Sequence, residues 1–435
     1  MTVRTRFAPS PTGSVHIGNV RVAIYNWLFA RHHGGQFLLR LEDTDRERST
    51  PEAVETVFDA MRWLGLDFDE TPVYQSKTLD QHLAAAETLL SKGLAYREDI
   101  GNTGKGEAVV FRMPGRDITF TDRVKGSMTK KAGDMKDLVI VRSNGTPVFH
   151  LANVVDDIHM GVTHVIRGDD HVENTFRHVP LFEALGAPVP EYAHLPMIVN
   201  AHGKPYSKRD GDAYVGDYRD HDYLSEALFN YLALLGWSPG DDREVMSRAE
   251  MIAAFDFKGV QSSPAQLDAR KLEWINQQHL LRIPADDYRA QALSRLRAAG
   301  LDPDAPPSGY ADAVTDLLRE RVKFLRELPA AAACFFRDDY PVDEKAAAKN
   351  LRREGATEQL AALHDALLAR PDFEPASVEA GIRNAAACLG VEENRLKPLL
   401  RVAITGQAGG PDLTAVASLL GSERVLTRIA RVLQP

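Results

Sequence analysis

Strand and helix patterns alternate over the first 95 residues, and this alternation constrains the fold more than any other feature. The run QFLLRL, Gln36 to Leu41, is apolar enough for a buried parallel strand. A strand is expected before it, at Val3 to Ala8, and helices are expected from Gly18 to Gly34 and from Thr50 to Trp63. Such strand–helix repeats form βαβ units, so the sequence predicts an α/β doubly wound parallel sheet.

The rest of the chain divides into segments of different character. Its 435 residues exceed one compact domain. Strand patterns disappear from about residue 240, and after Pro306-Pro307 the chain is rich in Ala and Leu at helical spacing. Between Lys105 and Lys131, seven Lys and Arg residues face three acids. These changes predict a Rossmann-type domain (1–95 and 140–240), an insertion (96–139), a helical domain (241–308) and an all-α region (309–435).

Charge and cysteine content exclude several classes of protein. The 26% charged and 44% hydrophobic residues are typical of a globular protein, and the net charge of −9 excludes a histone-like one. A nucleic-acid partner is still compatible with this net negative charge, because positive charge can cluster locally. With only Cys334 and Cys388, neither a disulfide framework nor a cysteine zinc site is expected. We see no secretory signal and no membrane-spanning apolar run, which predicts a soluble protein of a reducing compartment.

Two short motifs bear the chemistry. PSPTGSVHIGN places His16 and Gly18 where the first strand meets the first helix, at the carboxyl edge of the sheet. A helix N-terminus there attracts phosphate, glycine permits close approach, and imidazole can stabilise developing charge. PYSKRDGD places Ser207 before Lys208 and Arg209, two cations suited to clamping a polyphosphate.

Each of these features alone has a plainer interpretation. A lone His-x-Gly usually caps or solvates a helix start, and a Ser-Lys-Arg run is usually a solvated surface loop. The basic run in the insertion fits a solvated β-rich segment as well as a surface for a phosphate backbone. Taken together, the two motifs predict a two-part nucleotide site.

Longer motifs follow in order from residue 4 to the end of the chain. They are RFAPSPTG, FLLRLEDTDRER, FHLANVVDD, HVIRGDDH, FNYLALLGW, LDARKLEWIN, DDYPVDEKA and the AITG of 403–406. PSPTGSVHIGN is similar to the HIGH signature of class I aminoacyl-tRNA synthetases, and PYSKR is similar to their KMSKS loop. The whole series resembles the bacterial-type glutamyl-tRNA synthetases.

The resemblance implies a ligase that couples L-glutamate to tRNA-Glu through a glutamyl-adenylate, with ATP and Mg²⁺. It implies that the insertion binds the acceptor end, that residues 241–308 contact the stem and that residues 309–435 bind the anticodon. It further implies a cytoplasmic monomer without membrane contact, which needs bound tRNA to activate glutamate. Glutaminyl relatives end in β-barrels, so the all-helical end favours the glutamyl type. Discriminating relatives are expected to place an Arg near residues 365–369; none stands there, so tRNA-Gln stays open as a second acceptor.

The resemblance also implies roles in binding glutamate. Arg6 would hold the side-chain carboxylate, because a guanidinium can bind it bidentately. Glu42 would meet the α-ammonium group. Without the resemblance, Glu42 is better read as a surface acid and Arg167 as a salt-bridged surface residue. The other implied glutamate-binding positions are Ala8, Ser10, Phe149, Asn153 and Arg167.

For ATP, the resemblance implies a catalytic pair and a wider binding set. His16 and Lys208 would stabilise charge on the phosphates, since the reaction needs positioning and charge stabilisation. No protein ligand to a metal is expected. The implied ATP-binding positions are His16, Gly18, Asn19, Ser207, Lys208 and Arg209.

Basic residues in two regions are candidate tRNA phosphate contacts, although each could be a solvated surface charge. In the insertion these are Arg112, Arg116, Arg123 and Lys125. In the C-terminal part they are Arg352 and Arg353, followed by Arg383, Arg395 and Lys397.

The chain departs from the family pattern at a few positions. Phe149 replaces the usual Tyr, which removes one hydroxyl from the amino-acid pocket, and Pro205 replaces the first Lys of the KMSKS loop. Asp169-Asp170 replaces the usual Glu-Glu pair. Residues 96–139 contain no Cys or His, which predicts no zinc.

Two other functions are known for chains with parts of this pattern or fold, and the sequence argues against both. A truncated relative attaches glutamate to a tRNA base, but it lacks an anticodon-binding half such as residues 310–435. A non-catalytic protein on the same fold would be expected to lose His16 or Lys208, and both are present.

Overall fold

The computed structural model describes residues 2–45, 48–99 and 106–434. Two residues of the LEDTDRER motif, 46 and 47, and the first cation of the basic run, Lys105, lie outside the described residues. The chain divides into two compact units, Met1–Ile275 and Asn276–Pro435. Within the described ranges, no helix combines the length and apolar character needed to cross a membrane.

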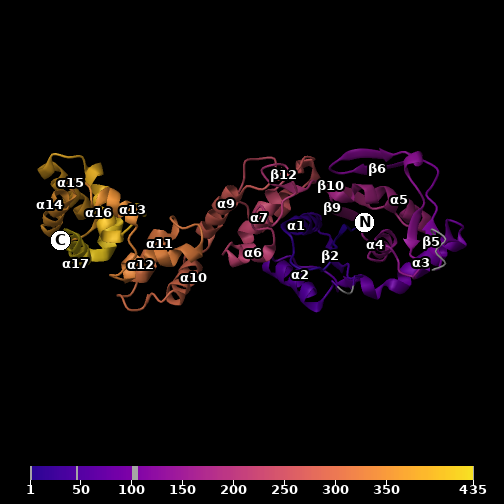
Figure 1. Cartoon of the computed structure of the whole chain (residues 1–435), viewed down its shortest axis with the longest axis horizontal. Helices are drawn as coiled ribbons and strands as arrows, with labels where there is room; N and C mark the ends of the chain where they lie inside the picture. The colour runs from indigo at the N-terminus through magenta and orange to yellow at the C-terminus, as the bar shows by residue number, and fades with distance from the viewer. Residues whose placement is uncertain (1, 46–47, 100–105, 435) are drawn as a thin grey trace. The chain divides into compact units, whose positions relative to one another are not determined.

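Parallel strands form the central sheet of the first unit (Figure 1). β2 (Gln36–Leu41) lies between β1 (Arg4–Phe7) and β3 (Val73–Tyr74), and β9 (His164–Gly168) pairs with β10 (Glu191–Leu195). The N–H of Thr163 donates to the carbonyl of Arg4 at 2.9 Å and so joins β1 to the start of β9. The resulting order, β3-β2-β1-β9-β10, is the doubly wound order, which confirms the predicted fold class.

Helices cover both faces of this sheet. α1 (Ile17–His32) packs with Phe7, Leu39 and Ile166 on one face. α5 (Val172–Leu185) packs with Leu38, Val165 and Tyr192 on the other, because successive strand residues point to opposite faces. The remaining helices around the sheet are α2 (Pro51–Trp63), α3 (Leu79–Ser91), α4 (Phe149–His159), α6 (Val215–Asp220), α7 (Ser225–Leu234) and α8 (Arg248–Ala254).

The strands of the insertion belong to two different sheets. β4 (Ala95–Glu98), β5 (Ala108–Phe111) and β8 (Leu138–Val141) form an antiparallel sheet of their own. β6 (Ile118–Asp122) and β7 (Gly126–Lys130) form a hairpin whose β6 pairs with β10 at Asp122 and Tyr192. This hairpin therefore extends the sheet that contains β9 and β10.

The expectation that strands end near residue 240 is wrong at one point. β12 (Ala265–Gln266) pairs in parallel with β11 (Ile198–Val199). A strand of two residues is too short to show alternation in the sequence. α9 (Ala269–Arg282) follows it and contains the boundary between the two units.

The described elements of the second unit are all helical, which confirms the predicted all-α C-terminal part. Its α-helices are α10 (Ala285–Ala298), α11 (Tyr310–Arg319), α12 (Leu328–Phe336), α13 (Glu344–Asn350), α14 (Ala356–Leu368), α15 (Pro375–Leu389), α16 (Glu393–Thr405) and α17 (Leu413–Leu433).

One buried cation connects three of these helices. Arg428 of α17 donates from Nη1 to the Ile404 carbonyl at 2.6 Å, and from Nη2 to the carbonyls of Cys334 at 2.7 Å and Arg337 at 3.0 Å. These carbonyls lie at the C-terminal ends of α16 and α12, where a helix has no internal donors left. Arg428 therefore supplies the missing donors at two helix ends.

Replacing Arg428 with Ala should lower the stability of the second unit. Two buried carbonyls and one partly buried carbonyl would lose a charged donor, so we expect the free energy of unfolding to fall by about 3 kcal/mol. Urea unfolding followed by circular dichroism measures this loss. Arg431→Ala is the matched control on the same helix, because Arg431 is exposed and donates to one carbonyl, that of Asp338. Equal effects of the two variants would contradict the role given to Arg428.

Candidate active site

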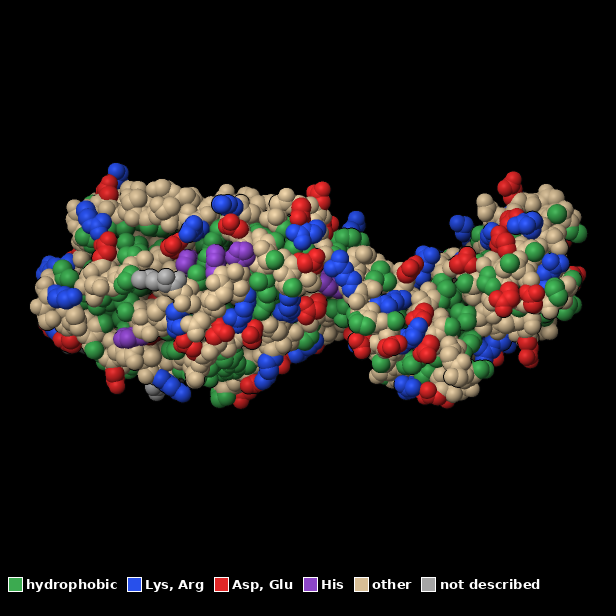
Figure 2. Space-filling model, turned by 180° about the vertical axis from the view of Figure 1, so that it is seen from behind, with side chains coloured by type: hydrophobic (Ala, Val, Ile, Leu, Met, Phe, Trp, Pro, Cys, Tyr) green, Lys and Arg blue, Asp and Glu red, His purple; other side chains and the backbone are tan. Residues whose placement is uncertain are grey.

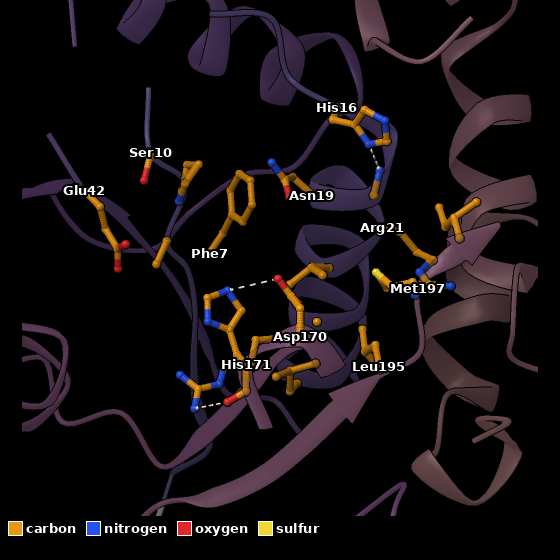
Figure 3. A pocket seen from close by; sticks show the side chains of 18 of the residues that line it. Phe7, Ser10, His16, Asn19, Arg21, Glu42, Asp170, His171, Leu195 and Met197 are labelled. Carbon is orange, nitrogen blue, oxygen red and sulfur yellow. Dashed lines mark hydrogen bonds and ion pairs between the residues drawn. The ribbon is translucent and has the colours of Figure 1, made fainter. Parts of the chain in front are cut away.

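A cavity of about 520 Å³ opens at the carboxyl ends of β1, β2, β9 and β10. Open parallel sheets bind ligands at this edge. Figure 3 shows Ser10 and Glu42 at one end, His16 and Met197 at the other, and His171 between them. The lining includes ten of the predicted site residues: Arg6, Ala8, Ser10, His16, Gly18, Asn19, Glu42, Phe149, Asn153 and Arg167.

Four basic side chains follow one another across the sheet beside this cavity. Arg6, Arg40, Arg167 and His194 are each the last residue but one of β1, β2, β9 and β10. Strand alternation turns all four to the face covered by α5, and Arg167 pairs directly with His194 in the sheet. All four are buried. We refer to them as the penultimate row.

Asp157 of α4 pairs with two members of this row. Arg6 donates from Nε to Asp157 Oδ1 at 3.1 Å and from Nη2 to Oδ2 at 3.4 Å, and Arg40 donates from Nη1 to the same Oδ1. Burial opposes the charge on Arg40, but the carboxylates of Asp157, Glu42 and Asp156 outweigh it and raise the pKa of Arg40. Burial likewise opposes the charge on Asp157, yet Arg40 and Arg6 hold its pKa below the ordinary value. The pairs fix α4 against β1 and β2.

Glu42 and Asn153, two predicted glutamate-binding residues, contact each other. Asn153 Nδ2 donates to Glu42 Oε1 at 3.1 Å, and Arg40 Nη2 donates to the same oxygen at 3.2 Å. The hydrogen bonds that the described residues make to this carboxylate all go to Oε1. Glu42 Oε2 is therefore open to a cationic group of a ligand.

Arg167 differs from the other arginines of the row, because it pairs with no acid among the described residues. Its Nη2 donates to Thr175 Oγ1 at 2.7 Å and to the His171 carbonyl at 3.3 Å, and its Nε donates to His194 Nε2 at 3.3 Å. Burial lowers the pKa of Arg167 to about 10, so it is charged at neutral pH. A buried charge with only neutral partners favours an anionic ligand.

His16 caps α1 and has a defined tautomer. Its Nδ1 accepts the N–H of Gly18 at 3.0 Å, so the neutral ring carries its proton on Nε2. Burial lowers the pKa of His16, and a hydrogen bond to the backbone of Tyr206 partly opposes this. A Cβ at Gly18 would lie 3.2 Å from Nδ1 and would crowd the ring. His16 is thus a neutral donor at the cavity.

The Ser-Lys-Arg loop is closed by Asp210. Ser207 donates to Asp210 Oδ2 from its N–H at 2.9 Å and from Oγ at 2.8 Å, and Asn200 Nδ2 donates to Oδ1 at 2.7 Å. The hydrogen bonds from Asn200 and Ser207 lower the pKa of Asp210. Ser207 is therefore occupied within its own loop, while Pro205 and Tyr206 line the cavity.

Lys208 and Arg209 lie on the exposed side of this loop and are absent from the cavity lining. Lys208 Nζ lies 5.7 Å from the ring centre of Tyr214, and that ring meets the edge of His16 with centres 5.9 Å apart. Tyr214 therefore connects the two predicted catalytic residues.

The basic run of the insertion is balanced by acids from other elements. Arg112 lies over the ring of Tyr96 at 4.3 Å. The other three candidates form ion pairs: Arg116 with Glu183, Arg123 with Glu191, and Lys125 with Asp169. In the second unit, Arg352 pairs with Glu344, and Arg353 donates to Gln359 and to the Arg395 carbonyl. Figure 2 shows both signs of charge interspersed over one face.

Several residues of the site escaped the sequence analysis: Arg21, Arg40, Asp157, His171 and His194. A usable signal was present for two of them, because Arg40 and His194 are polar residues near the end of apolar strands. Arg21 is buried in α1 and donates from Nη1 to the Leu235 carbonyl at 3.1 Å. No group of three or more His, Cys, Asp or Glu side chains among the described residues is arranged to hold a metal ion.

Comparisons with known proteins show the family to which the chain belongs. A family model described as tRNA synthetases class I (E and Q), catalytic domain, matches residues 2–103 and 99–274, and an anticodon binding domain model matches residues 287–433. The glutamate–tRNA ligase of Xanthomonas campestris pv. campestris (strain B100) is 42% identical over 99% of this chain and 98% of its own length. Glutamate–tRNA ligase 1 of Alkalilimnicola ehrlichii is 40% identical, over 98% and 97%.

A solved structure is similar to this chain over both units. It is the crystal structure of a glutamate tRNA ligase from Elizabethkingia meningosepticum in complex with its amino acid. Its TM-score with this chain is 0.88 at 30% identity, and the match covers 100% of this chain and 99% of that one.

Replacing Asp157 with Asn should destabilise the first unit in a pH-dependent way. Arg6 and Arg40 would lose their shared carboxylate, so the free energy of unfolding at pH 7 should fall by about 3–5 kcal/mol. A carboxyl with a depressed folded pKa stabilises the fold above its unfolded pKa of about 3.9, and this contribution is lost as pH falls through the folded pKa.

Guanidinium chloride unfolding at a series of pH values tests this prediction. The difference between variant and parent should be constant above about pH 5 and should shrink below it. Glu55→Gln is the control, because Glu55 pairs with Arg62 while both are largely exposed, and little change is expected. A difference for Asp157→Asn that does not vary with pH would contradict the ion-pair assignment.

Proposed function

Because the chain belongs to the glutamate–tRNA ligases of the class I tRNA synthetases, we propose that it joins L-glutamate to the 3′ end of tRNA-Glu with ATP as co-substrate. In the first step, an oxygen of the α-carboxylate attacks the α-phosphate of ATP, which forms glutamyl-adenylate and releases pyrophosphate. In the second, a hydroxyl of the terminal adenosine attacks the activated carbonyl, which forms the ester and releases AMP.

The charge pattern of the cavity is the observation that best supports this proposal. Arg167 offers an uncompensated cation for a carboxylate, and Glu42 Oε2 offers an open acceptor for an ammonium group. The Nη1 of Arg6 takes no part in the ion pair with Asp157. In this proposal, Arg6 and Arg167 together bind the side-chain carboxylate of the glutamate substrate. An amino acid with a second carboxylate matches this set. Ala8, Ser10, Phe149 and Asn153 form the remaining walls of the glutamate site.

The other end of the cavity binds ATP in this proposal. His16 presents its Nε2–H to the phosphates, and Lys208 moves in from the loop to add a full charge. Gly18 and Asn19 at the start of α1, with Ser207 and Arg209 of the loop, complete the ATP site. Mg²⁺ bound to the phosphates of ATP would neutralise part of their charge, and we assign it no protein ligand.

The tRNA would contact both units. Arg112, Arg116, Arg123 and Lys125 would receive the acceptor end on the insertion (96–139), with residues 241–308 along the stem. Arg352 and Arg353 would contact the anticodon side within residues 309–435. We further propose a cytoplasmic monomer without zinc, and tRNA-Gln stays open as a second acceptor.

Glutamate-dependent exchange of pyrophosphate into ATP, with and without total tRNA, tests the function. We expect exchange only when tRNA is present. Exchange without tRNA would retain glutamate activation but contradict its dependence on tRNA. Absence of exchange under both conditions, with protein shown to be folded, would overturn the proposal.

Replacing Lys208 with Ala should lower the rate of glutamate activation far more than it raises the glutamate KM. Removing a group that stabilises charge in the transition state reduces kcat by about 10²- to 10³-fold. The exchange assay at varied glutamate measures both constants. Lys258→Ala, which removes an exposed lysine elsewhere in the same unit, should leave both unchanged. A raised KM with an unchanged kcat would refute the role of Lys208.

A further inference from the structure

Asp122 and His194 form a hydrogen-bonded series that ends at Arg167, and the proposed reaction assigns them no role. Asp122 Oδ2 lies 2.7 Å from His194 Nδ1, and His194 Nε2 accepts the Nε–H of Arg167 at 3.3 Å. His194 and Asp122 have no exposed side-chain surface, and neither lines the cavity. The series thus runs from β6 through β10 to β9 and ends at a residue that faces the cavity.

The contacts fix the tautomer of His194. Asp122 is an acceptor, because hydrogen bonds from His194 and from the Lys125 N–H outweigh its burial and lower its pKa. The proton of the neutral imidazole must therefore lie on Nδ1, which leaves a lone pair on Nε2. That lone pair faces Arg167 Nε and the hydroxyl of Thr175, 3.0 Å away.

His194 is held in the neutral form by its surroundings. Burial lowers its pKa and the charge of Arg167 lowers it further, while the hydrogen bond and charge of Asp122 work in the opposite direction. The ring stacks on Tyr192, with centres 5.9 Å apart and planes 7° apart. A neutral ring adds no positive charge beside Arg167, so it can accept a hydrogen bond without repelling the guanidinium.

Asp122 also belongs to the turn of the β6–β7 hairpin. Its Oδ1 accepts the N–H groups of Val124 and Lys125, both at 2.8 Å, and its Oδ2 accepts the N–H of His194 at 3.1 Å. One carboxylate therefore closes the hairpin turn, joins the hairpin to β10 and sets the protonation of the His194 ring.

We propose that Asp122 and His194 are positioning residues for Arg167, and that they set the affinity for glutamate rather than the rate of phosphate chemistry. His194 and Thr175 hold Nε and Nη2 of the guanidinium, so that the remaining edge faces the substrate carboxylate. This inference rests on the proposed function, in which Arg167 binds that carboxylate. His16 and Lys208 act at the phosphates of ATP, and neither belongs to the hydrogen-bonded series of Asp122, His194 and Arg167.

Asp122→Asn tests the tautomer with almost no change of shape. The amide oxygen can still accept from the hairpin N–H groups, but the amide NH₂ would donate to His194 Nδ1. The imidazole proton would move to Nε2 and oppose the N–H of Arg167. We expect the glutamate KM to rise about 10- to 100-fold, which corresponds to losing a hydrogen bond to a charged group, while kcat and the ATP KM change little.

Two substitutions of His194 separate positioning from packing. His194→Gln keeps an oxygen near the place of Nε2 and should retain most of the affinity for glutamate. His194→Asn keeps polar atoms only near the place of Nδ1 and should raise the KM as Asp122→Asn does. Tyr192→Phe is the matched control, because the buried Tyr192 hydroxyl has no hydrogen-bond partner among the described residues and its ring lies beside His194. Its KM should not change.

Nitrogen-15 NMR of the imidazole rings gives a second readout that does not depend on activity. The His194 signals, assigned by their loss in His194→Gln, should show a proton on Nδ1 in the parent and on Nε2 in Asp122→Asn. A proton on Nε2 in the parent would overturn the proposal. An unchanged glutamate KM in Asp122→Asn, or equal effects of His194→Gln and His194→Asn, would also overturn it. Failure of the proposed function is distinct, because the parent would then show no exchange whatever its tautomer.

Discussion

The ion pairs of Asp157 with Arg6 and Arg40 fix the geometry on which the rest of the site depends. They join α4 to two neighbouring strands at the level where those strands end. α4 in turn supplies Phe149 and Asn153 to the cavity. Buried ion pairs contribute little net stability compared with apolar packing, but they are costly to break, so they select one arrangement of their partners. In this structure, that arrangement positions Arg6 of β1 and the two α4 residues, Phe149 and Asn153, around the amino-acid end of the cavity.

The arginines of the penultimate row differ in whether they have a counter-charge, and this difference determines which ligands the cavity favours. Arg6 and Arg40 share Asp157, whereas Arg167 has only neutral partners in the described structure. A buried cation without a counter-charge is unfavourable in the empty site, and an entering carboxylate removes that penalty. The same feature that destabilises the empty site therefore favours a dicarboxylic amino acid in it.

Local patterns in the sequence predicted the fold class and the place of His16 and Gly18, whereas the family resemblance implied the other predicted residues of the cavity. His16 and Gly18 lie at a strand–helix junction that apolar periodicity places at the sheet edge. Asp157 and Asp122 could not be predicted in this way, since their partners Arg6 and His194 are 151 and 72 residues distant. The charge count in the insertion is incomplete for the same reason, because Glu183, Glu191 and Asp169 pair with its cations from other elements. The charges in a segment can be counted from its sequence, but only the folded structure shows which of them form ion pairs.

The β6–β7 hairpin shows how an insertion can take part in a site that it does not line. Its strand β6 pairs with β10, so Asp122 arrives beside His194 at the end of the sheet. Lys125 in the hairpin turn binds Asp169, which immediately precedes the cavity residue Asp170. The hairpin thus reaches Arg167 of β9 indirectly, through Asp122 and His194, and pairs directly with Asp169 after β9. Because strand pairing leaves little freedom of register, any displacement of this hairpin must shift the groups that orient Arg167.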